Sequence, residues 1–79
     1  MQVQQAKLLK IDQEIAIKKA RLNQLGAGKW GTYLDAIVNR HMSASDLVAR
    51  ANLTGELMQL AFDLERLGKE RTQVILGGQ

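Results

Sequence analysis

The chain has 79 residues, a net charge of +3, no cysteine and no proline. A chain of this length forms at most one domain, and it buries only about 60% of its unfolded surface, so its core is marginally stable alone. Disulfides are excluded, and the single histidine, His41, cannot form a zinc site by itself. We therefore expect no metal or cofactor, and we expect a second protein chain to support the fold.

The same composition bears on location. No run of about 18 apolar residues occurs, so no membrane span is expected. The first residues, Met1 to Gln5, lack the basic and then apolar pattern of a secretory signal. The lack of cysteine fits a reducing compartment. We expect a cytoplasmic protein.

A heptad pattern predicts the first helix. Lys18 is the one exception in a row of apolar a and d positions, which we interpret as a side chain that extends its ammonium to the edge of the core. The alternative is a polar residue that fixes register or oligomeric state. Gly26 is suited to the left-handed cap of a helix over about 3–25. The apolar positions are Leu8, Ile11, Ile15, Leu22 and Leu25.

The segment 26–31, Gly-Ala-Gly-Lys-Trp-Gly, interrupts the helical pattern and contains the only tryptophan, Trp30. Its glycines have the G-x-G-x-x-G spacing of a dinucleotide site, but that motif must follow a strand, and here it follows a helix. We interpret the segment as a hinge. Trp30 either closes the open end of the helical core or anchors a partner, and Tyr33 would share that role.

Two further helices follow the hinge. The spacing of apolar residues predicts a short helix over about 31–41. Ser43 as N-cap and Asp46 three residues later then mark a new helix start, which we expect to extend over about 44–75 and to be followed by a frayed tail, 76–79. If the chain continues through 42–43 without a break, the two helices form one bent rod.

The last predicted helix is apolar on two sides, so more than one partner must cover it, and we expect residues 47–62 to be the most buried part of the chain. Gly55 is expected to let another backbone approach, whereas Gly68 has no explanation in the sequence. The first side carries Leu53, Leu57, Leu60, Leu64 and Leu67, and the second carries Leu47, Ala51, Met58 and Phe62.

The two heptad rows can be paired antiparallel, with Leu8 opposite Leu67. The predicted fold is all-α: an antiparallel, coiled-coil-like helical hairpin with a short middle helix, which dimerises into a helical bundle. The same apolar rows could also pair between two chains instead of within one. The register places three charged pairs at its flanks: Lys7–Glu70, Arg21–Glu56 and the like-charged Glu14–Asp63.

No nucleophile, base and orienting acid occur together in a pattern that suggests catalysis. We expect a non-catalytic protein–protein interaction module, a small adaptor, co-chaperone or inhibitor that acts as a homo-oligomer. The residues expected to bind the partner are Trp30, Tyr33, Met58 and Phe62.

Two alternatives remain open. A nucleic-acid-binding helical dimer would use one side of the first helix, where basic residues gather. The pattern Trp30-x-x-Tyr33-Leu34-x-x-Ile37 resembles the turn region of flagellar and type III export stalk proteins, and the alternative that accompanies it is a small component of a secretion, export or phage assembly. The basic residues of the first alternative are Lys7, Lys10, Lys18 and Arg21.

Overall fold

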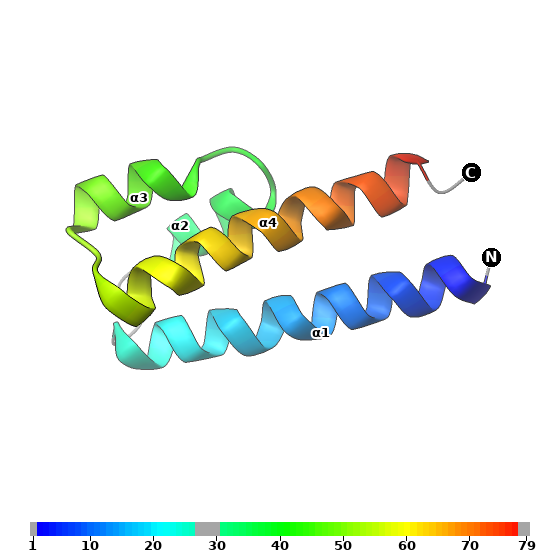
Figure 1. Ribbon diagram of the computed structural model, residues 1–79, viewed down its shortest axis with the longest axis horizontal. Helices are drawn as coiled ribbons and strands as arrows, with labels where there is room; N and C mark the ends of the chain where they lie inside the picture. The colour runs from blue at the N-terminus through cyan, green and yellow to red at the C-terminus, as the bar shows by residue number, and fades with distance from the viewer. Residues whose placement is uncertain (1, 27–30, 78–79) are drawn as a thin grey trace.

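The computed structural model describes residues 2–26 and 31–77. These residues form four helices and no strand: α1 (Gln2–Leu25), α2 (Gly31–Val38), α3 (Ala44–Ala51) and α4 (Gly55–Gly77). The predicted all-α class is confirmed for them. The long helices α1 and α4 lie side by side and run in opposite directions, while α2 and α3 pack on α4 away from most of α1 (Figure 1). The molecule measures 40 × 20 × 19 Å.

Local signals at the ends of α1 and α2 explain where these helices stop. α1 ends at the predicted residue, Leu25, and the N–H of Gly26 donates to the carbonyl of Leu22 at 2.9 Å, as in a further helical turn. The hinge residues 27–30, including Trp30, lie outside the described residues. α2 ends three residues earlier than expected, because Arg40 adopts a left-handed φ of 66°. The N–H of His41 then reaches the carbonyl of Ala36 at 2.8 Å, which closes a Schellman motif.

The prediction of a single helix over 44–75 is wrong, because the structure breaks it after Ala51. Its start is confirmed, since the Oγ of Ser43 accepts from the N–H of Asp46 at 3.1 Å. The chain then leaves the helix at Asn52, which has a left-handed φ of 53°, and α4 begins at Gly55, with a φ of 57°. Asparagine and glycine tolerate this conformation better than other residues, so the two together redirect the chain. α4 then continues to Gly77, past the predicted end at 75.

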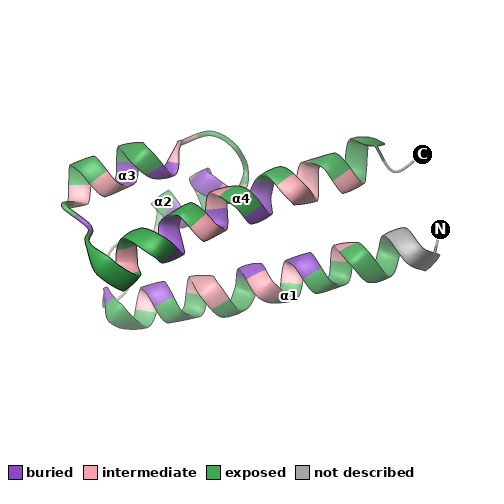
Figure 2. Ribbon diagram, in the orientation of Figure 1, coloured by how far each residue is buried: buried purple, intermediate pink, exposed green. Residues whose placement is uncertain are grey.

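The buried residues lie between the four helices (Figure 2), and those among residues 5–26 and 31–77 that form the core are aliphatic. Most of the predicted heptad positions are buried, and Leu8 and Leu57 are half-buried. The prediction is wrong for Leu25, the last residue of α1, which is 42% exposed. The short helices complete the core from the other side of α4. Its buried members are Ile11, Ile15, Leu22, Leu34, Ile37, Ala44, Leu47, Leu53, Leu60, Ala61, Leu64 and Leu67.

The prediction that residues 47–62 form the most buried part is also wrong. Leu47 is buried and Ala51 is partly buried, but Met58 and Phe62 are 40% and 39% exposed. The break after α3 is the reason, because it separates the apolar side of α3 from that of α4. α4 then turns its leucine row toward the core, and the row containing Met58 faces outward.

A close approach between α2 and α4 explains Gly68, which the sequence left without a reason. A Cβ atom at this position would lie 2.6 Å from the carbonyl oxygen of Val38, the last residue of α2. Only glycine lets the two backbones come this close. Gly55 has nothing within 4 Å of the equivalent position, so the expectation that it permits a close approach is wrong.

Ion pairs join α1 to α4. The predicted pair between Arg21 and Glu56 is confirmed, with Nε and Oε2 at 3.0 Å. The predicted pair between Lys7 and Glu70 is wrong, because Glu70 accepts from Arg66 one turn earlier on α4. Asp63, predicted to lie opposite Glu14, pairs with Lys18 at 3.3 Å. A further pair connects Arg71 with Asp12 at 2.8 Å.

Candidate protein-binding surfaces

An apolar patch on α4 contains two of the residues expected to bind a partner. Met58 and Phe62 are four residues apart, so they lie one turn from each other on the same side of the helix. Both are exposed, although the sulfur and the ring are apolar groups that core packing normally covers. Side chains of this type at a surface provide contact area for another protein. We call these two residues the Met58–Phe62 patch.

The other two expected residues lie apart from this patch. Tyr33 is on α2, where it is 44% exposed while its neighbour Leu34 is buried. Trp30 lies outside the described residues. The fold therefore brings Met58 and Phe62 together and places Tyr33 on a different helix.

The basic side of α1 is partly neutralised by α4. Lys18 is half-buried and donates to Asp63, which agrees with a side chain that extends its charge to the core edge. Arg21 donates two hydrogen bonds to Glu56, at 3.0 and 3.4 Å. These hydrogen bonds lower the pKa of Glu56 from its ordinary value and raise the pKa of Arg21. Within the described residues, only Lys7 and Lys10 of the four expected cations have no carboxylate at ion-pair distance.

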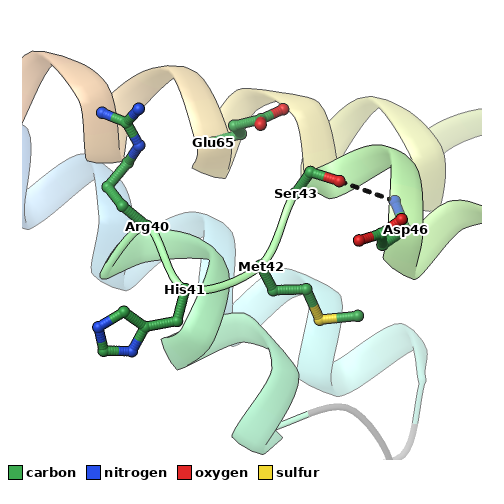
Figure 3. A pocket seen from close by; sticks show the side chains of 6 residues that line it. All are labelled: Arg40, His41, Met42, Ser43, Asp46 and Glu65. Carbon is green, nitrogen blue, oxygen red and sulfur yellow. Dashed lines mark hydrogen bonds between the residues drawn. The ribbon is translucent and has the colours of Figure 1, made fainter.

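A shallow polar pocket of about 280 Å³ lies where the α2–α3 loop meets α4 (Figure 3). Its polar side chains include Arg40 and His41 from the loop, Asp46 from the first turn of α3 and Glu65 from α4. In Figure 3 the guanidinium and the imidazole extend away from the two acids, so the four groups do not converge on one point. The described residues also contain no group of three metal-ligating side chains. These four side chains therefore form no convergent group in the pocket.

The pocket could not be predicted from the sequence, because no sequence motif contains its lining residues. Arg40 and His41 reach the pocket through the left-handed turn that ends α2, and Glu65 reaches it from a helix more than 20 residues later in the chain. The only available signal was the short stretch of polar residues before Ser43. That stretch indicates a loop, but it does not indicate what the loop packs against.

No helix within residues 2–26 and 31–77 combines the length and the apolar character needed to cross a membrane. Comparison of the chain with protein-family models, with curated proteins and with solved structures finds no match in any of the three.

Proposed function

We propose that this chain is a non-catalytic protein-binding module, a small helical adaptor, co-chaperone or inhibitor that acts as a homo-oligomer. The Met58–Phe62 patch is its main binding surface, and Trp30 and Tyr33 near the hinge are additional anchors. One observation carries the proposal. Both aromatic side chains in the described part of the chain, Tyr33 and Phe62, are exposed, while the core consists of leucine, isoleucine and alanine.

The location of the aromatic residues is informative because aromatic side chains contribute large apolar areas to a core. Phe, Tyr and Trp bury roughly 150–250 Å² each when they are packed. The exposed 39% of Phe62 then corresponds to about 80 Å², and covering it would contribute about 2 kcal/mol. Contributions of this size are typical of hot spots in protein interfaces.

The surroundings of the patch suggest what its partner looks like. Lys69 is exposed and lies seven residues beyond Phe62, which is two turns along the same side of α4. A partner helix with apolar residues one turn apart, followed by a carboxylate, would fit the patch and this lysine. An amphipathic helix of an acidic protein therefore has the chemistry that this surface would bind.

A nucleic-acid partner has less support. Two of the four basic residues expected to contact it, Lys18 and Arg21, are already paired with carboxylates of α4. The two proposals differ in their response to salt. Binding to a polyanion weakens steeply with ionic strength, by about one unit of slope for each phosphate neutralised, whereas an apolar protein contact changes little.

The test is affinity capture from cells that make the protein, with tagged wild type and the variants Phe62→Ala and Met58→Ala. Ile75→Ala is the matched control, because Ile75 is a 50% exposed apolar residue elsewhere on α4. We expect the two patch variants to lose the captured protein at both low and high salt while their melting temperatures stay close to that of wild type. Unchanged capture by the patch variants, or capture that disappears with salt or nuclease treatment, would contradict the proposal.

A further inference from the structure

α1 has a face without charged residues on the side opposite its core row. Figure 2 shows this side of α1, turned away from α4, as largely exposed. Leu9 and Ile17 are 60% and 68% exposed there, which places them among the most exposed large apolar residues of the described chain. The exposed residues of this charge-free face include Ala6, Leu9, Gln13, Ala16, Ile17, Ala20 and Gln24.

The charges of α1 lie beside this face rather than on it. Asp12 pairs with Arg71 and Lys18 with Asp63, both across to α4. Lys19 pairs with Asp35 of α2. A helix face that only meets water normally carries charged and polar residues, so a face that lacks charge and exposes leucine and isoleucine is expected to meet another helix.

The spacing on this face is that of a helix–helix interface. Residues 6, 9, 13, 16 and 20 alternate steps of three and four, which is the a/d pattern of a coiled coil, here as a second row on the same helix. Three of the five are alanine. Small side chains let two helices approach to the short end of the 8–10 Å range of packed helices.

We propose that the charge-free face of α1 binds the same face of a second copy of this chain, with the two α1 helices antiparallel. The register is the one in which paired core residues have numbers that add up to 29. In it Leu9 of one copy packs on Ala20 of the other, and Gln13 packs on Ala16, so each of these layers combines a larger residue with a small one. The proposal gives a surface to the homo-oligomer of the proposed function and rests on that part of it.

Charge complementarity selects this register. Residues that flank the contact on one side have numbers that add up to 31, so Asp12 of each copy lies beside Lys19 of the other. Asp12 already pairs with Arg71, and Lys19 with Asp35, so the contact continues an alternating row of charges. If the helices were moved by one heptad, so that paired residues added up to 22, Asp12 would lie beside Asp12 of the other copy. Lys10 would likewise lie beside Lys10 of the other copy. Such exposed pairs are weak, so they decide register more than affinity.

The same register covers the most exposed apolar residue of the face. On the other side of the contact, flanking residues have numbers that add up to 27. Ile17 of one copy therefore lies against the methylene stem of Lys10 of the other, and the ammonium of Lys10 can remain in water. The contact covers residues from about 6 to 23, which is roughly 27 Å of helix. Because this is one helix pair, we expect an interface at the small end of specific complexes and a micromolar dissociation constant.

Sedimentation equilibrium over a concentration series tests the contact. We expect wild type to dimerise and Leu9→Glu to raise the dissociation constant at least tenfold, with the helical circular dichroism of the monomer unchanged. The control Ile75→Glu makes the same kind of change at a similarly exposed residue of α4, and it should dimerise like wild type. Monomeric wild type at the highest soluble concentration, or equal effects of the two variants, would overturn the proposal.

Cysteine crosslinking tests the direction and register, since the chain has no cysteine of its own. A mixture of Leu9→Cys and Ala20→Cys chains should give a crosslinked heterodimer with a short bis-maleimide, and each variant alone should not. In the antiparallel register two copies of position 9 are about 16 Å apart along the helix axis. Crosslinking of Leu9→Cys with itself would indicate a parallel pair and overturn the proposal. The Met58–Phe62 patch is on α4, so the capture experiment can succeed or fail independently of this one.

Discussion

Replacement of Gly68 by alanine should destabilise the protein, although the same change stabilises most helices. Alanine is favoured over glycine inside a helix by about 1 kcal/mol. At Gly68, however, the added Cβ would lie 2.6 Å from the carbonyl oxygen of Val38 and 3.2 Å from its carbonyl carbon. To restore an ordinary contact of 3.4 Å, the end of α2 must move by about 0.8 Å away from α4.

The obstacle is backbone rather than a flexible side chain, and the two residues of α2 that enter the core, Leu34 and Ile37, would move with it. Overpacking of this kind costs roughly 1–3 kcal/mol, and we take the upper end because a helix terminus must shift. After subtraction of the gain in helix propensity, we expect Gly68→Ala to lower the free energy of unfolding by about 2 kcal/mol. In a domain of this size that corresponds to roughly 8–16 °C in melting temperature.

Urea unfolding followed by circular dichroism measures this effect, with all proteins at one concentration because association would add to the apparent stability. Gly77→Ala is the control on the same helix, since nothing lies within 4 Å of its added Cβ. We expect the control to stay within about 0.5 kcal/mol of wild type. If Gly68→Ala proves as stable as wild type or more stable, the close packing of α2 on α4 is wrong.

Three further predictions concern helix ends and one ion pair. Arg40→Gly should stabilise the protein by about 1 kcal/mol in urea unfolding, because Arg40 has a φ of 66° that glycine adopts without strain; a loss of stability would contradict this. Ser43→Ala should cost about 1 kcal/mol by the same measurement, because it removes the cap on the N–H of Asp46, and no loss would show that the cap is dispensable. Arg21 lowers the pKa of Glu56, so the contribution of their pair is complete at neutral pH and is lost as the pH falls below the ordinary value of Glu56 and through its lower folded value. An NMR titration should therefore show the pKa of Glu56 rise in Arg21→Gln, and an unchanged value would mean that the pair does not persist in solution.

Parts of the fold that depend on local patterns could be predicted from the sequence. The end of α1 at Gly26 and the start of α3 after Ser43 are both specified by residues within one helical turn of the boundary. The apolar rows of α1 and α4 follow a heptad, so the sequence also indicates which side of each long helix is buried. The pair between Arg21 and Glu56 followed from that pattern alone.

Features that depend on the direction of the chain after a turn, or on contacts between residues far apart in the sequence, could not be predicted in this way. Asn52 and Gly55 are each compatible with a helix interior, and only their combined left-handed conformations end α3 and redirect the chain. The same break explains why residues 47–62, predicted to be the most buried part, include the exposed Met58 and Phe62. The role of Gly68 depends on its contact with Val38, 30 residues earlier, which no local pattern encodes.

The central claim is that the Met58–Phe62 patch of α4 binds another protein. Photo-crosslinking at position 62 tests this claim most directly. Benzoylphenylalanine in place of Phe62 keeps an aromatic group at the surface and reacts with whatever lies against it in the cell. We expect one crosslinked adduct with a different protein, and no such adduct when the same probe replaces Ile75 on the same helix. Adducts only with nucleic acid, or the same adducts from both positions, would contradict the account.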